Sequence, residues 1–416
     1  MFVVIFTLNI YSTIEQILSY NKDNEVFQEY WIEHQKFNQL KPNDLQSVIF
    51  NMAILPPANL GMMFPEIKQF VGVSAIDQNS IKYLFKKINF GIFIGIIFSL
   101  LALILSFHTI AGEREEGMLK LVDSYPVKRA KIITGKWLGI VTTIGLLYSA
   151  CYVVTVLLIV VYANIQIESV DVISLFLIYF IGIVYISGIV LLGIYISIKV
   201  RHSYLSLLIS LLVWALVVLV FPSIPDYAGR LIKVPSSLQM FYSEIGDGAK
   251  KSVKIKEIKE KYKKNGIAED SKEAQMEIEK AIIQISRQNS IKQKFEDGAL
   301  KRLGLSMGLS FLSPYASYTL AANEVAATGV SVNILLMKQR EGYRKRLRDY
   351  LKQIKERSRN DPQYKPDYSD IPKFVFKNPP VLVRLAAAGV PFMLLLIFNI
   401  SFFIMSLRSF RKYDVR

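Results

Sequence analysis

The sequence predicts an all-α integral membrane protein, with six helices that span the membrane and two extracytoplasmic insertions between them. Of its 416 residues, 52% are hydrophobic, and the mean hydropathy is positive. The apolar residues lie in long uninterrupted runs, and the charged residues lie in the stretches between these runs. This distribution is typical of a chain that crosses a membrane several times.

Five apolar runs are long enough to cross a membrane as helices. Each has 18 or more residues and contains no Asp, Glu, Lys or Arg. Because a helix rises about 1.5 Å per residue, about 20 apolar residues cross the roughly 30 Å of hydrocarbon in a bilayer. The predicted spans are Ile88–Phe107, Leu138–Tyr162, Val172–Ile198, Tyr204–Phe221 and Leu385–Leu407.

A further span, the first in the chain, is predicted over residues 1–20, although its apolar run is short. Met1–Ile14 is apolar, and Glu15 interrupts the run. A secretory signal peptide would begin with basic residues and end at a small-residue cleavage site, and neither feature is found here. We therefore expect a first transmembrane helix that lacks part of its cytoplasmic lead-in.

Lysine and arginine residues in the short connections predict the side of the membrane that each connection faces. Twelve lie in the loop at residues 109–137, in the link that holds Lys199 and Arg201, and in the C-terminal tail, whereas the loop at residues 163–171 has none. Because cytoplasmic loops carry an excess of these residues, we expect the three basic segments in the cytoplasm. Basic residues near the outer ends of the spans oppose this prediction without reversing it, because long translocated regions largely escape the rule.

This topology divides the chain into five predicted regions. The spans are separated by one insertion after the first helix and by a second, larger one before the last. The regions are the first helix at 1–20, an extracytoplasmic insertion at 21–87, helices two to five at 88–222 with the loop at 109–137, a large basic extracytoplasmic domain at 223–384, and the sixth helix with a cytoplasmic tail at 385–416.

The larger insertion contains predicted helices of its own. Apolar residues at helical spacing on either side of Asn265-Gly266 predict two antiparallel amphipathic helices between Lys250 and Phe295. A third, densely basic helix is predicted over Asn333–Arg359, followed by an extended stretch, DPQYKPDYSDIPKF.

The basic charge of the chain is concentrated in this insertion. From Pro222 to Arg384 there are 31 Lys and Arg against 19 Asp and Glu, a net charge of +12 out of +16 for the whole chain. The excess indicates either an acidic partner or anionic lipid headgroups, or it is a solvated helix surface without a partner. A nucleic acid partner is not expected for a domain outside the membrane.

Catalysis by this chain is not predicted. The three histidines, His34, His108 and His202, have no metal-ligand spacing, and no glycine-rich loop with a Lys-Ser/Thr pair is present to bind phosphate. The single cysteine, Cys151, lies within a predicted span and cannot form a disulfide within the chain. We therefore expect no enzyme activity, no metal and no cofactor in this chain, and any energy it uses must come from a partner.

The most informative segment is the loop between the second and third spans. It reads AGEREEGMLKLVDSYPVKRAKIITGKWLG from Ala111 to Gly139. We predict one short amphipathic helix here, with apolar Met118, Leu121, Val122 and Tyr125 on one face and Glu113, Glu116, Lys120 and Asp123 on the other. Such a helix lies at the membrane surface and presents its charges either to a cytoplasmic protein or to lipid alone.

The loop carries its motifs in a recognisable order. They are Glu113-Arg114-Glu115-Glu116-Gly117, then Tyr125-Pro126-Val127 with basic residues behind it, then Gly135-Lys136 before a long apolar span. This order resembles the loop between the second and third helices of ABC-2 type transporter permeases. The segments Pro56–Gly72 and Leu312–Gly329 are similar to the subgroup with large extracytoplasmic insertions, which is related to the nitrous oxide reductase maturation permease.

The resemblance implies a permease subunit in a bacterial cytoplasmic membrane, paired with itself or with a related permease. A separate cytoplasmic ABC ATPase would bind ATP-Mg and couple its hydrolysis to export, or to mechanical action on an extracytoplasmic partner protein. The alternative is a membrane-anchored receptor or scaffold that transports nothing. The residues implied in ATPase coupling are Glu113, Arg114, Glu115, Glu116, Gly117, Met118 and Pro126.

Overall fold

The computed structural model describes residues 90–162, 169–232, 258–259, 261–263, 271–360 and 377–411, and all regular structure in these ranges is helical. The all-α fold class is thus confirmed for the described part of the chain. The predicted first helix at 1–20 and the insertion at 21–87 lie outside the described residues.

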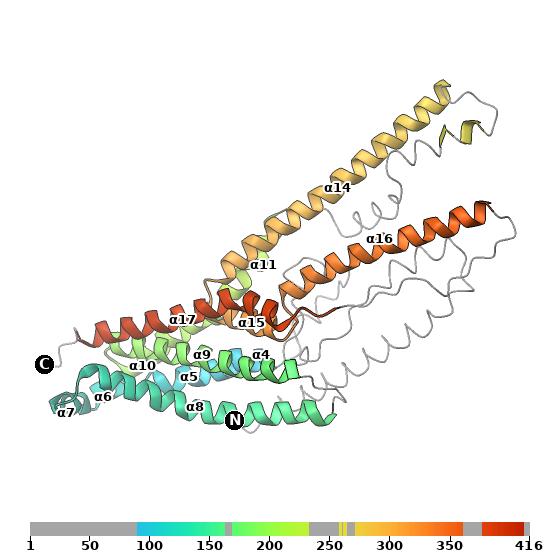
Figure 1. Ribbon diagram of the computed structural model, residues 1–416. Coiled ribbons are helices and arrows are strands. Elements are labelled where there is room, and N and C mark those ends of the chain that lie inside the picture. The colour runs from blue at the N-terminus through green and yellow to red at the C-terminus, as the bar shows by residue number, and fades with distance from the viewer. Residues whose placement is uncertain are drawn as a thin grey trace. The chain divides into compact units, whose positions relative to one another are not determined.

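Five helical segments are long and apolar enough to cross a membrane, and each overlaps one of the five predicted apolar runs. They are α4 (Phe90–Ile92), η2 (Phe93–Phe98) and α5 (Ser99–Ser106); α8 (Arg129–Tyr162); α9 (Ser169–Lys199); α10 (Ser203–Trp214), η3 (Ala215–Val220) and η4 (Phe221–Ser223); and α17 (Val381–Arg411). Figure 1 shows them as long neighbouring helices. Several helices exceed the apolar runs, because charged residues at a helix end reach the aqueous boundary while the helix continues.

Helix α9 lies at the centre of the spans. It contacts α5, α8, α10 and α17, and most of its side chains from Ile181 onwards are buried. Tyr148 of α8 stacks on Tyr179 of α9, with ring centroids 5.2 Å apart. Aromatic pairs of this kind add about 0.5–1.5 kcal/mol beyond the area that they bury. A displacement of α9 would therefore disturb every span that surrounds it.

A short helix that the sequence analysis did not predict, α15 (Pro314–Val325), packs against α9 and α17. Ten of its twelve residues are buried, and many of them are Ala or Ser, which allow helices to approach closely. Tyr318 of α15 stacks on Tyr185 of α9 at 4.8 Å. The hydroxyl of Ser313 accepts the Ala316 N–H at 3.2 Å and donates to the Val217 carbonyl at 2.7 Å, which fixes the start of α15.

The region between the last two spans is divided between two compact units. Among the described residues, one unit holds 90–224 with 309–411, and the other holds 225–308. The first unit therefore contains α15 and α16 (Val330–Asn360), which matches the predicted basic helix at Asn333–Arg359. The extended stretch predicted after it lies outside the described residues.

The second unit contains α11 (Ile224–Leu231) and most of α14 (Lys272–Ser310). α14 runs well beyond Phe295, where the prediction ended the helix, and the predicted break at Asn265-Gly266 lies outside the described residues. Lys261 pairs with Glu277 of α14 at 3.0 Å, and this hydrogen bond holds the pKa of the Glu277 carboxyl below its usual value. The pair links α14 to the short helical stretch that precedes it.

Candidate functional site

The loop between the second and third spans consists of two short helices instead of the single helix predicted. α6 (Ala111–Glu115) and α7 (Met118–Ser124) are separated by Gly117, whose φ is 72°. This left-handed conformation breaks the helix, and glycine adopts it without steric cost. Among the residues that the structure describes, apart from Gly117 and its two chain neighbours, no atom lies within 4 Å of the position that a Cβ would take at Gly117. The backbone conformation, and not a lack of space, therefore favours glycine here.

The start of α6 is tied to the end of α9. The backbone N–H groups of Ile110 and Ala111 donate to the buried hydroxyl oxygen of Ser197, at 3.0 and 2.9 Å. The first N–H groups of a helix have no partner within it and need one from elsewhere. Ser197 of α9 supplies that partner, although more than 80 residues separate it from α6 in the sequence.

Arg114 makes the reciprocal contact. Its guanidinium donates from Nη1 to the Val200 carbonyl at 2.8 Å and from Nη2 to the Ile198 carbonyl at 3.0 Å. Ile198 lies in the last turn of α9 and Val200 directly follows the helix, where the helix dipole is negative and carbonyl acceptors lack partners within the helix. α6 and α9 thus cap each other.

Arg129, at the start of α8, donates in the same way to the carbonyls at the C-terminal end of α17. Its Nη1 atom donates to the carbonyls of Phe410 and Arg411 at 3.1 and 3.3 Å, and its guanidinium lies 5.8 Å from the ring centre of Phe410. The loop therefore contains two arginines, and each one holds the C-terminal end of a different span.

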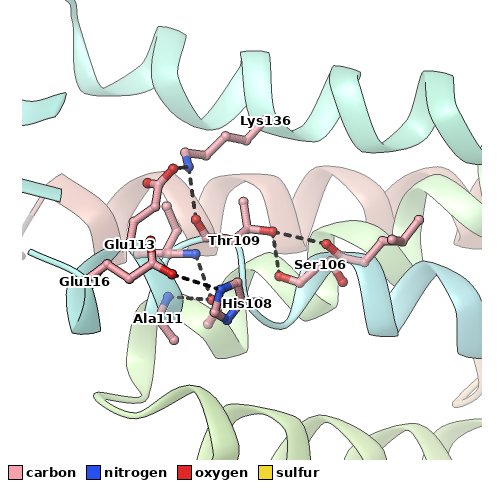
Figure 2. Close-up of polar contacts among 10 residues, drawn as sticks. Ser106, His108, Thr109, Ala111, Glu113, Glu116 and Lys136 are labelled. Atoms are coloured by element: carbon pink, nitrogen blue, oxygen red, sulfur yellow. Dashed lines mark hydrogen bonds and ion pairs between the residues drawn. The ribbon is translucent and has the colours of Figure 1, made fainter. Parts of the chain in front are cut away.

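Glu113 connects α6 to α8. Its Oε1 atom lies 2.5 Å from the ammonium of Lys136, which also donates to the Thr109 carbonyl at 3.0 Å. Figure 2 shows Lys136 reaching down from its helix to both groups. The lysine side chain is only 17% exposed, so this ion pair is less screened by water than a surface pair.

The other two carboxylates face histidines. Glu115 lies 3.3 Å from Nδ1 of His202, which precedes α10. Glu116 lies 3.8 Å from Nε2 of His108, whose Nδ1 atom is 2.9 Å from the hydroxyl of Ser203 at the start of α10. Glu113, Glu115 and Glu116 thus each contact a different helix end or turn, and these contacts hold the loop to the helix ends around it.

α7 and the residues directly after it carry exposed apolar side chains. We call the side chains of Met118, Leu121, Tyr125 and Val127, which are between 47% and 61% exposed, the α7 surface. Leu119 points the other way and is buried in the core. Leu119 therefore anchors α7 in the core, while the apolar side chains of the α7 surface remain exposed.

The structure brings the predicted coupling residues together but gives them different surroundings. Glu113 and Arg114 are half-buried and contact other helices of the protein. Glu115 and Glu116 are exposed and lie beside histidines, and Gly117, Met118 and Pro126 are exposed as well. Sequence reasoning missed the contacts of Arg129, although this residue lies in the loop itself, and it missed Ser197 and His202 because no local spacing relates them to the loop. The basic residues behind Tyr125-Pro126-Val127 were the signal that pointed towards Arg129.

A family model described as "ABC-2 family transporter protein" matches residues 1–415. The chain belongs to the ABC-2 transporter family. Its members are permease subunits of ABC transporters, and they generally work as dimers with a cytoplasmic ATPase. A search of curated proteins found no match for this chain. This ABC-2 permease is thus a membrane component, and permeases of the family are not themselves catalytic. The described spans and the two-helix loop are parts of that component.

Proposed function

We propose that this ABC-2 permease receives the motion of a separate cytoplasmic ATPase through α6 and α7 and passes it to α9 and α17. The observation that carries the proposal is the pair of arginines in the loop. Arg114 holds the end of α9, and Arg129 holds the end of α17. A force on the loop would therefore be transmitted to α9 and α17 at once.

The α7 surface is the part of the loop that we propose contacts the ATPase. Its apolar side chains are exposed next to Glu116 and Lys120, which are also exposed. An apolar patch with charged residues around it is the usual composition of a protein interface. ATP-Mg would bind to the ATPase, and this chain would contribute contacts and no catalytic group.

We propose that the output is mechanical action on an extracytoplasmic partner of acidic character. Export of a hydrophobic molecule between two permease copies is the alternative output of the same coupling. The support for a partner is the charge of α16. Its exposed residues include Lys338, Lys345 and Arg346, and it belongs to the same compact unit as the spans. Long basic surfaces attract acidic partners over a distance set by the ionic strength.

Accessibility of cysteines tests the topology on which this proposal depends. In a Cys151→Ser background, a cysteine at Lys263 should react with a membrane-impermeant maleimide in intact cells, because it would be extracytoplasmic. A cysteine at Glu116, also exposed, should react only after the membrane is permeabilised. The reverse pattern would place the loop outside the cell, beyond the reach of an ATPase, and would contradict the proposal.

A further inference from the structure

A tight turn joins the buried helix α15 to the long helix α16. The Thr328 N–H donates to the Asn323 carbonyl at 3.0 Å, and the Ala327 N–H donates to the Glu324 carbonyl at 3.2 Å. Ala327 has a φ of 58°, the left-handed conformation with which helices of this pattern end. The turn therefore has a defined geometry, and α16 begins at Val330, directly after it.

Glu324 of α15 holds the start of α16. The residue is only 4% exposed. One carboxylate oxygen accepts the backbone N–H of Ser331 at 3.1 Å, and the other accepts the Ser331 hydroxyl. Ser331 lies in the first turn of α16, where N–H groups lack partners within the helix and the dipole favours negative charge. The Glu324 carboxylate, which belongs to α15, therefore caps the start of α16.

Gly329 provides the space that this carboxylate occupies. A Cβ at Gly329 would lie 2.3 Å from Cδ of Glu324, closer than such atoms approach in proteins. The φ of Gly329 lies outside the left-handed region, so the close approach and not the backbone conformation requires glycine. Alanine at this position would displace the Glu324 carboxylate without changing Glu324 itself.

A second contact fastens α16 to the segment that leads into α17. The side-chain amide of Gln339 donates to the Lys377 carbonyl at 2.8 Å and accepts the Lys377 N–H at 2.9 Å. Because α17 begins at Val381, this pair of bonds ties α16 to the lead-in of a span. α16 is thus held at two points, once to α15 and once to the start of α17.

Glu324 makes two hydrogen bonds to Ser331, although a single bond to a backbone N–H would cap the helix. A serine or asparagine caps a helix without a charge, and a buried carboxylate is costly unless hydrogen bonds compensate it. Here both oxygens of Glu324 accept bonds from Ser331, and hydrogen bonds to a charged group are about twice as strong as neutral ones. The neighbouring helix α15 packs in turn against α9 and α17, the two spans whose ends the loop arginines hold.

We propose that Glu324 and Gln339 are positioning residues that make α16 move as one piece with α15 and α17. The inference rests on the proposed function, because the motion would enter through α6 and α7, and it names the contacts by which that motion reaches the extracytoplasmic helix. Without these contacts, α16 would remain folded but would no longer follow the spans.

Distances between spin labels test this inference in the complete permease–ATPase complex in lipid nanodiscs. The label is attached to a cysteine at Lys345, an exposed position on α16, in a Cys151→Ser background. Double electron–electron resonance then measures the label-to-label distance between the two permease copies, with and without a non-hydrolysable ATP analogue. We expect a nucleotide-dependent shift in the parent protein, and we expect Glu324→Ala and Gly329→Ala to lose it.

Matched variants separate loss of the joint from general damage. Glu324→Gln should retain the shift, because the amide can still accept the Ser331 N–H and donate to its hydroxyl oxygen. Ala327→Gly should also retain it, because glycine adopts the left-handed conformation readily. If Glu324→Ala does not fold, Gln339→Ala, which removes a contact at the protein surface, should still broaden the distance distribution and reduce the shift.

A shift in Glu324→Ala as large as in the parent protein would overturn the inference, and so would the absence of a shift in the parent protein. The rate of ATP hydrolysis on the same samples distinguishes this result from a failure of the proposed function. Stimulated hydrolysis in Glu324→Ala with the shift lost supports the inference. An ATPase that does not bind the parent permease would contradict the proposed function itself.

Discussion

Replacing Arg114 and Arg129 together by alanine should leave the ATPase bound to the permease but reduce the coupled activity at least about tenfold. Each arginine donates two hydrogen bonds to the carbonyls at the end of a span, and neither belongs to the α7 surface. A hydrogen bond to a charged group contributes about 1.5–3 kcal/mol, and partial exposure reduces that value. Since about 1.4 kcal/mol corresponds to a factor of ten, the loss of four such bonds is sufficient for the expected effect.

The matched control is the double variant Lys128→Ala/Lys131→Ala. It removes two positive charges from the same loop, and both lysines are exposed. The measurements are co-purification of the ATPase and the rate of hydrolysis that the permease stimulates in nanodiscs. Equal losses in both double variants would mean that the net charge of the loop matters and that the caps on α9 and α17 do not.

Replacing Leu121 by aspartate should weaken the binding of the ATPase strongly. Leu121 is 53% exposed in the middle of the α7 surface, and burial of a leucine side chain contributes about 1.5–3 kcal/mol. A carboxylate at this position would lose that contribution and would also have to be desolvated in the interface. We expect at least about a hundredfold weaker binding in a titration with the purified ATPase, which corresponds to roughly 2.8 kcal/mol.

Leu121→Met is the control, because it keeps a similar apolar volume and should bind normally. The parallel variant Leu119→Asp has a different expected result. Leu119 is buried in the core, so a charge there should lower the yield of folded protein. Normal ATPase binding by Leu121→Asp would mean that the α7 surface contacts lipid alone.

The spans were predictable from the sequence because each one is a long run without charge. Five runs predicted five helices, and the structure has a helix at each. The exact ends were less predictable: α8 begins at Arg129, well before the apolar run at Leu138, because the helix continues into the aqueous boundary where charged side chains are solvated. Hydropathy marks the part of a helix that lies in hydrocarbon and does not mark its first residue.

The contacts that define the site could not be predicted in the same way. The loop motif identified Glu113, Arg114 and Glu115, but their partners lie in other spans, and Arg114 binds a carbonyl 86 residues away. The short helix α15 also gave no signal, since its Ala and Ser residues have neither the hydropathy of a span nor a clear amphipathic period. Contacts between distant helix ends depend on the packing of the spans, which no local pattern records.

The most direct test of the proposed coupling is a photo-crosslinker at Leu121. With p-benzoyl-phenylalanine at this position in the native membrane, irradiation should produce a covalent adduct with the ATPase subunit. The same crosslinker at Lys345, which is also exposed but predicted to be extracytoplasmic, should produce none. If Leu121 gives only lipid adducts while the ATPase still co-purifies, the ATPase docks elsewhere, and the role assigned to α6 and α7 is wrong.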